Sequence, residues 1–242
     1  MSVKVGSALV KHNHIHTRLL SFLLSMILIW GCQPSSFVEP FTTGLEPEPY
    51  RIVRDSLTSG TYLGITINDD AATVYPAIQT LQASKGVTYL NVVSNVFSDL
   101  TPLKDRLSLY QTILLDQKPG SDSGVQITVE GQAVKSIYLN SGRQLTQWPE
   151  RLDASSSVRV GDTVSSLYDK LINVQAIGQY ANKFDYISLL TKNLSTSYDA
   201  GMDQSPQWYF GYSTGPNQMD QIQIHFQGGK VSKLYIDHYS KY

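Results

Sequence analysis

The sequence repeats itself, and this repeat constrains the fold more than any other feature. Residues 125–139 (VQITVEGQAVKSIYL) align without gaps on residues 222–236 (IQIHFQGGKVSKLYI), at an offset of 97 residues. Five of the 15 positions are identical, and four more exchange one apolar residue for another. Matches continue upstream in the same order, with the offset falling to 93. The sequence therefore predicts two copies of one structural unit.

Each copy predicts the same succession of elements. A short strand, at residues 64–68 and again at 158–162, leads into a segment with helical spacing of its apolar residues. The strands expected after it are residues 87–97, 107–115 and the hairpin 125–139 in the first copy, and 184–194, 206–213 and the hairpin 222–236 in the second. Valine, threonine and tyrosine favour a strand over 87–97 and 184–194, although their spacing also allows a helix.

The register of the two hairpins follows from the alternation of their side chains. A three-residue loop at 228–230 keeps apolar residues on one face and polar residues on the other, whereas a two-residue loop sets Gln223 against Leu234 and mixes the faces. In this register Gln223 faces Tyr235 in the second copy, and Gln126 faces Tyr138 in the first.

These elements combine into an α+β fold class. We expect two tandem repeats, each with a helical element packed on an antiparallel β-sheet of about four strands. The expected divisions are a leader in residues 1–31, an acylated cysteine with a proline-rich tether in 32–61, a first repeat in 62–140, a linker in 141–157 and a second repeat in 158–242.

The first 31 residues have the pattern of a secretory signal peptide. Lys4, Lys11 and Arg18 make the segment positive, and it contains no acidic residue. The apolar run that follows, Leu19–Trp30, has 12 residues. That run is too short for a membrane span, which needs about 20 residues, but it suits a signal peptide.

Cys32, the only cysteine in the chain, directly follows this run. The sequence ILIWGC, residues 27–32, resembles the lipobox of bacterial lipoproteins, except that Trp30 stands where that pattern usually has a small residue. The resemblance implies that Cys32 is acylated after cleavage and anchors the protein in a membrane. Gln33 at the next position implies the outer membrane. An uncleaved anchor and a reactive thiol are the alternatives.

A second resemblance concerns the architecture. The segments ITINDDAATVYPAI (65–78) and VRVGDTVSSLYDKL (158–171), together with the terminal hairpins, resemble the family of the beta-lactamase inhibitor protein and that of the small outer-membrane lipoprotein of the barrel-assembly machinery. Both families place helices against a four-stranded antiparallel sheet, and the inhibitor does so in tandem. This resemblance covers residues 62–239.

Charge and composition narrow the classes of partner and cofactor. Removing the leader takes away three basic residues and no acidic one, which leaves 16 basic and 20 acidic residues and a formal charge of −4. That balance argues against a nucleic acid partner. The sequence predicts no cofactor, no metal site and no catalytic constellation, because His12, His14 and His16 lie in the leader and no zinc-ligand spacing occurs elsewhere.

Two groups of residues are candidates for binding. Alternation directs Trp208, Phe210 and Tyr212 to one face of a strand, where such residues form either an interface or a core. The other group would form a recognition surface on the non-core face of the sheets, unless it only packs across strands. The candidate binding residues are Trp208, Phe210, Tyr212, Gln126, Tyr138, Gln223, Tyr235 and His225.

The favoured function is therefore non-catalytic. We expect a lipid-anchored envelope protein that binds another envelope or extracellular protein through its sheet faces. A lipoprotein that binds the cell wall or a glycan is the alternative. A hydrolytic enzyme is less favoured, and a pocket that joined His225 or His238 to a carboxylate and a hydroxyl would favour it.

Overall fold

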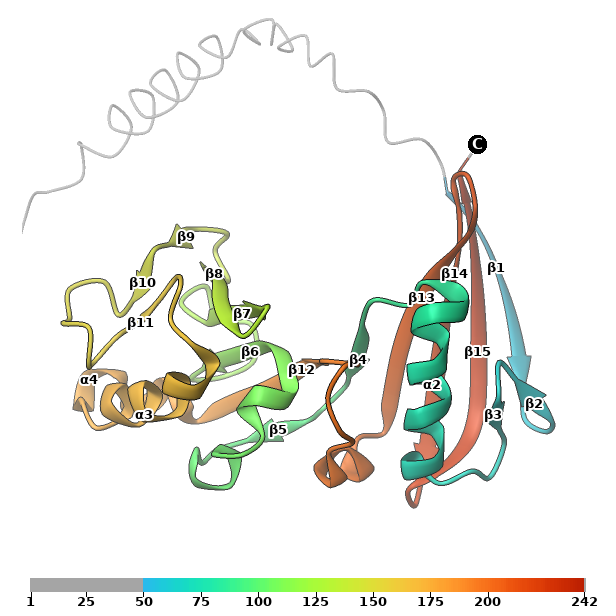
Figure 1. The fold of residues 1–242 in the computed structure, drawn as a ribbon, viewed down its shortest axis with the longest axis horizontal. Coiled ribbons are helices and arrows are strands. Elements are labelled where there is room, and N and C mark those ends of the chain that lie inside the picture. The colour runs from blue at the N-terminus through green and yellow to red at the C-terminus, as the bar shows by residue number, and fades with distance from the viewer. Residues whose placement is uncertain (1–49, 242) are drawn as a thin grey trace, which may run out of the picture. The chain divides into compact units, whose positions relative to one another are not determined.

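Antiparallel strands dominate the computed structural model, which describes residues 50–241. Cys32, the leader and most of the tether lie outside the described residues. Eleven strands form one sheet, and β5 (Val96–Phe97) pairs with β12 beside the main path. The main path runs β1 (Tyr50–Leu57), β15 (Lys230–Lys241), β14 (Gln218–Gln227), β13 (Gln207–Gly215), β4 (Leu90–Val92), β12 (Tyr186–Lys192), β6 (Tyr110–Asp116), β7 (Val125–Glu130), β8 (Ala133–Leu139) and β9 (Gln144–Leu145) (Figure 1).

Smaller elements accompany this sheet. The two-stranded ribbons are β2 (Thr61–Tyr62) with β3 (Ile65–Thr66), and β10 (Gln147–Trp148) with β11 (Val158–Arg159). The α-helices of the described residues are α2 (Ala71–Lys85), α3 (Val164–Gln175) and α4 (Gly178–Ala181). Short 3-10 turns occur at Thr101–Leu103, Leu107–Leu109, Asn182–Phe184 and Ala200–Gln204. Within residues 50–241, no helix has the length and apolar character that a membrane span requires.

The expected fold class, two tandem α+β repeats that each place a helical element on a sheet of their own, is wrong. Strands of both copies enter one 11-stranded sheet, and within residues 50–241 only three short α-helices accompany it. Segment 184–194 holds strand β12, as its composition indicated, whereas 87–97 holds two short strands, β4 and β5, in place of one. These strands pair across the boundary between the copies. The physical reason is an exchange of elements between the two copies.

Helix α2 comes from the first copy but is bonded to the hairpin of the second. The backbone N–H of Ala71 donates to the carbonyl of Gly229 (3.1 Å), and the N–H of Val231 donates to the carbonyl of Asp69 (2.9 Å). At the other end of this helix, the ammonium group of Lys85 lies 5.5 Å from the ring centre of Tyr212 on β13. Helix α2 therefore covers strands of the second copy, as Figure 1 shows.

Helix α3 makes the reciprocal contacts with the first copy. The N–H of Val164 donates to the carbonyl of Gln132 (3.0 Å), and the N–H of Val134 donates to the carbonyl of Asp162 (2.8 Å). The repeat relates Val164 to Ala71 at the offset of 93, and Gln132 to Gly229 at the offset of 97. The bonds at the start of α3 are therefore equivalent to those at the start of α2. Each copy thus supplies the helix that starts on the hairpin of the other copy.

The order of the strands reflects the same exchange. The first half-sheet consists of β1, β15, β14, β13 and β4, and the second half-sheet consists of β9, β8, β7, β6 and β12. Strands β13, β14 and β15 repeat β6, β7 and β8, so the two halves have matching orders about the β4–β12 pair. Strand β9 pairs with β8 as β1 pairs with β15 in the first half-sheet. The β10–β11 ribbon likewise corresponds to the β2–β3 ribbon.

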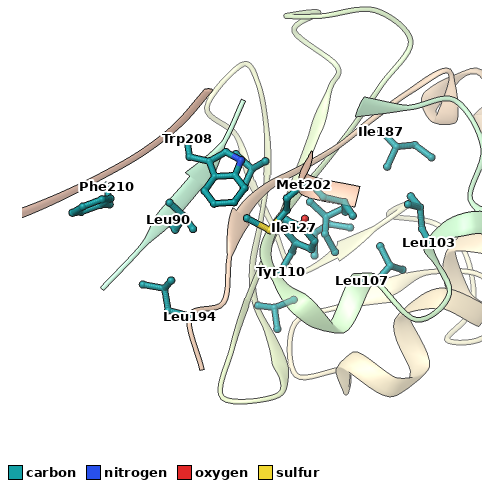
Figure 2. Packing of buried hydrophobic residues seen from close by; sticks show 14 of the residues in the cluster. Leu90, Leu103, Leu107, Tyr110, Ile127, Ile187, Leu194, Met202, Trp208 and Phe210 are labelled. Atoms are coloured by element: carbon teal, nitrogen blue, oxygen red, sulfur yellow. The ribbon is translucent and has the colours of Figure 1, made fainter. Parts of the chain in front are cut away.

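The apolar core lies on the side of the sheet that carries the helices. Trp208 and Phe210 on β13 are completely buried there, near Leu90 and Met202 (Figure 2). The indole of Trp208 packs on the ring of Phe226, with ring centres 4.6 Å apart. The same side continues under the second half-sheet, so one core joins the two halves.

The predicted hairpin register is confirmed in both copies. Gln223 pairs with Tyr235, and Gln126 pairs with Tyr138. The expected three-residue loop is wrong, because Gln227 pairs with Lys230 across a two-residue turn. A β-bulge at Ser232, just after this turn, shifts the pairing by one residue, which restores the separation of apolar and polar faces.

A buried polar cluster lies where the copies meet. Lys192 on β12 is fully buried, and its ammonium group lies 5.1 Å from the ring centre of Tyr75 on α2 and 5.8 Å from that of Tyr110 on β6. It also donates to Thr196 and to the carbonyl of Asn193. Burial lowers the pKa of Lys192 to about 8 and raises that of Tyr75 to about 12. The cluster ties residues of both copies together in the core.

Candidate binding face

The side of the first half-sheet turned away from the core carries a continuous polar and aromatic surface, which we call the outer face. Side chains alternate along β13, so Trp208 and Phe210 point into the core while Gln207 and Tyr209 point the other way. The register extends this surface across the neighbouring strands in the pairs Gln207–His225, Tyr209–Gln223, Gln223–Tyr235, Gln221–Asp237, Met219–Tyr239 and Arg54–Asp237.

A hydrogen-bond network holds the middle of the outer face. Arg54 on β1 donates twice to the carboxylate of Asp237 on β15, at 2.6 and 2.8 Å. Gln223 donates to the same carboxylate at 2.9 Å, and Gln207 donates to Gln223 at 3.4 Å. Asp237 is buried, and the hydrogen bonds from the Arg54 guanidinium hold the pKa of this carboxyl below its ordinary value. The network is therefore ionised and orders four strands.

Tyr235 forms an aromatic platform beside this network. The guanidinium carbon of Arg54 lies 4.8 Å from the ring centre, and the ammonium nitrogen of Lys233 lies 5.3 Å from it. The ring of His225 meets Tyr235 edge-on at 5.2 Å. Burial lowers the pKa of His225, and the charges of Lys233 and Arg54 lower it further. His225 is thus neutral near pH 7, and its Nε2 is buried without a hydrogen-bond partner among the described residues.

A cavity of about 400 Å³ opens towards the Met219–Tyr239 pair of the outer face. Tyr89, Met219 and Tyr239 line it together with Gly211 on β13. Burial raises the pKa of Tyr89, and the neighbouring Tyr209 and Tyr239 raise it further, so this phenol stays protonated at neutral pH. The hydroxyl of Tyr239 donates to Gln221 at 3.2 Å, which orients its ring.

The eight candidate residues fall into three places. Trp208, Phe210 and Tyr212 lie in the core. Gln223, Tyr235 and His225 come together on the outer face. Gln126 and Tyr138 pair with each other on the second half-sheet, and strands β13, β4, β12 and β6 separate them from the Gln223 group.

Several residues of the outer face escaped the sequence analysis. Arg54 lies in the segment expected to be tether, although the neighbouring Ile52 and Val53 are β-branched residues that favour a strand. Asp237, five residues before the C-terminal end of the sequence, is buried against Arg54. No local pattern indicates this pair, because the two residues are 183 positions apart. Tyr89 and Gly211 likewise meet only after folding.

His238 lies on the opposite face of β15, between two carboxylates. Its Nδ1 is 2.6 Å from Asp220 and its Nε2 is 3.4 Å from Asp55. A cavity of about 240 Å³ contains His238, Asp220 and the hydroxyl-bearing residues Thr214 and Ser240. Both imidazole nitrogens are directed at carboxylates, so the ring bridges β1 and β14 and neither nitrogen is aimed at a hydroxyl. The carboxylates raise the pKa of His238.

Comparison with known proteins does not assign a function to this site. The chain matches no family model, no curated protein and no solved structure. Among the residues that the structure describes, no group of three or more histidine, cysteine, aspartate or glutamate side chains is arranged to hold a metal ion.

Proposed function

We propose that the protein is anchored in the bacterial outer membrane through lipid on Cys32, and that its outer face binds another protein of the envelope or the extracellular space. The observation that carries the second part is the network of Arg54, Asp237 and Gln223, which holds Tyr235 beside two cations. The first part rests on the lipobox-like sequence before Cys32.

The chemistry of the outer face suits a protein partner. Tyrosine and arginine are enriched among the residues that contribute most to protein–protein binding. Here their side chains project from paired strands and are already hydrogen-bonded, so little conformational entropy would be lost on binding. Because Arg54 neutralises Asp237, the surface around Tyr235 retains the positive charge of Lys233. This charge favours a partner surface with acidic groups.

Site-directed photocrosslinking in the native host tests the protein partner. A benzophenone amino acid at position 235 of the full-length chain should give one adduct of defined mass. The same probe at the exposed position Thr73 on α2 should not give that adduct. Arg54→Ala should reduce the yield at position 235, because it removes the group that holds Asp237 and flanks the ring. Equal adducts at positions 235 and 73, or none at 235 and 209, would contradict the proposal.

The anchor has a separate test. Cys32→Ser should move the protein from the membrane fraction to the soluble fraction, and it should abolish incorporation of an alkyne-labelled fatty acid. The matched control is Ser35→Ala, which alters a neighbouring hydroxyl but leaves the thiol. Cys32 would not be the anchor if the Cys32→Ser protein stayed in the membrane fraction and the wild-type protein incorporated no fatty acid.

A further inference from the structure

Glycine at position 211 lets two wall residues of the cavity beside Tyr89 approach the backbone of β13 closely. A Cβ atom at Gly211 would lie 2.7 Å from the hydroxyl of Tyr89 and 3.0 Å from the terminal methyl carbon of Met219. Both distances are shorter than ordinary van der Waals contact. Any side chain at this position would therefore push against the residues that form the walls of the cavity. Gly211 thus forms a floor without a side chain, on which the ends of Tyr89 and Met219 rest.

The second half-sheet provides an internal comparison. At the repeat offset of 97, Leu114 on β6 corresponds to Gly211 and Tyr186 on β12 corresponds to Tyr89. Leu114 faces Gln126 and Ser188 in the register of that half-sheet. A branched apolar side chain thus stands where the first half-sheet has a glycine, so Tyr186 cannot approach the sheet there as Tyr89 does. The two copies share a fold but differ at the position that shapes this cavity.

The lining of the cavity combines aromatic faces with uncharged polar groups. Tyr89 and Tyr239 contribute rings with apolar faces, and Met219 contributes a flexible thioether. Asn217 and Gln218 contribute side-chain amides, which both donate and accept hydrogen bonds. Among the described residues that line it, none is a carboxylate and Lys241 is the single charged one.

This lining excludes several ligand classes. A cation would find no carboxylate there, and a polyanion would meet a single ammonium group. A purely apolar ligand would bury the amides without hydrogen-bond partners. A pyranose ring fits both parts of the lining, because its C–H face packs on aromatic rings while its hydroxyls pair with amides. The volume of about 400 Å³ lies at the lower end of the range for small-molecule sites, roughly 300 to 1,000 Å³.

We propose that the cavity formed by Tyr89, Gly211, Met219 and Tyr239 binds a neutral saccharide of one or two pyranose rings. The cavity opens near the turn between β13 and β14, where Gly215 and Asn217 lie, so a longer glycan can extend from it into solvent. This site is distinct from the network around Tyr235, and it does not depend on a protein partner.

Titration of the full-length protein in detergent with neutral disaccharides, followed by two-dimensional NMR, tests this inference. N,N′-diacetylchitobiose and cellobiose serve as probes, and chitobiose-containing oligomers test whether a chain binds better than a single unit. At least one disaccharide should bind saturably below about 10 mM. The shifted amides should cluster at residues 86–91 and 211–219.

Matched variants separate the site from general effects. Gly211→Leu installs the residue that the other half-sheet carries and should weaken binding by at least about tenfold. Tyr239→Ala, which leaves the floor unchanged, should do the same, while Tyr186→Ala in the second half-sheet should bind as the wild type does. Circular dichroism verifies that each variant is folded.

Three results would overturn the inference. The first is that no neutral saccharide binds saturably. The second is that binding persists in both Gly211→Leu and Tyr239→Ala, and the third is that the shifted amides cluster around Tyr235. Binding at this cavity by an apolar peptide instead of a saccharide would assign it to a protein partner. Photocrosslinking at position 235 is read separately, so failure at one site leaves the other testable.

Discussion

At the scale of single residues, burial decides the state of several ionisable groups. Asp237 is ionised because Arg54 and Gln223 satisfy its oxygens, whereas His225 is neutral because burial and two cations oppose its charge. Lys192 has no carboxylate in direct contact among the described residues, and its nearest polar partners are hydroxyl and carbonyl oxygens. A charge in that position is costly, because a protein interior solvates it less well than water does.

The Lys192 charge should make stability depend on alkaline pH. The folded pKa of about 8 is below the ordinary value of 10.5, so the folded state binds fewer protons than the unfolded state between those values. Stability relative to Lys192→Met should therefore rise from pH 8 to pH 10, by on the order of 1–3 kcal/mol. Urea unfolding at pH 7, 8, 9 and 10 measures it. A constant difference would mean that folding does not lower the pKa of Lys192.

At the scale of elements, the two hairpin turns have the same backbone but different residues. Gly228 and Gly229 have φ angles of 58° and 75°, and Gly131 and Gln132 have 58° and 72°. Positive φ at both central residues is the conformation that two-residue hairpin turns prefer. Gln132 adopts it with a side chain, which costs free energy that glycine avoids. The carbonyl of Gln132 also accepts the N–H of Val164, so the turn cannot relax without loosening α3.

Exchanging these residues should change stability in opposite directions. Gln132→Gly should stabilise the protein by about 0.5–1 kcal/mol, after the added flexibility of the unfolded chain is counted. Gly229→Gln should destabilise it by about 1 kcal/mol. Thermal and urea unfolding of the two variants measure both effects. If Gln132→Gly destabilises the protein, contacts of the glutamine side chain matter more than its backbone conformation.

Strand β1 is held to the sheet by ion pairs on both faces. Arg54 pairs with Asp237 on the outer face, and Asp55 pairs with His238 on the other. The groups that face His238 are Asp220 and Asp55, and Tyr212 donates to Asp220 from β13. Only the pair that contains histidine changes charge near neutral pH.

Protection of β1 should therefore fall as pH rises. The pKa of His238 is raised, so its stabilising charge is fully present below the ordinary value of 6.5 and is lost as pH rises through the higher folded value. Hydrogen exchange of residues 50–57, corrected for intrinsic rates, should show less protection at pH 8.5 than at pH 6. Asp55→Asn should reduce this difference in protection. Asp122 is an exposed acid in the loop before β7, so Asp122→Asn should leave the difference unchanged. Equal pH dependence in both variants would contradict a role for Asp55.

At the scale of the whole molecule, the exchange of elements makes the two copies interdependent. The first half-sheet takes β1 and β4 from the first copy and β13, β14 and β15 from the second. The second half-sheet takes β6, β7 and β8 from the first copy and β12 from the second, and β9 comes from the residues between the copies. If the chain is cut between the two copies, each half-sheet therefore still contains strands from both fragments.

A protease site inserted at Ser141–Gly142 tests this interdependence. These residues are exposed in the turn between β8 and β9. After cleavage, the two fragments should co-elute under native conditions and unfold in one transition, because neither fragment contains a complete half-sheet. An uncleaved sample of the same protein is the control. Separation into two folded fragments would contradict the exchanged topology.

Part of this structure could be read from the sequence. Alternation along a strand is a local property, so it correctly paired Gln223 with Tyr235 and Gln126 with Tyr138. The repeat also identified which segments would be helices and strands in each copy. The loop was misjudged because a β-bulge changes the count of residues without changing the faces, and no residue type marks it.

The sequence by itself determined the helices and hairpins of the two copies, the hairpin registers and the face on which each side chain of those hairpins lies. It did not indicate β1, β9 or β10, which lie in the expected tether and linker. Tertiary structure alone decided which copy each helix packs against. Because the two copies have similar apolar patterns, a helix fits either hairpin, and no local pattern distinguishes the exchanged arrangement from the unexchanged one. The same step brought Arg54 to Asp237 and Tyr89 to Gly211. The two features of the outer face therefore exist only in the assembled sheet.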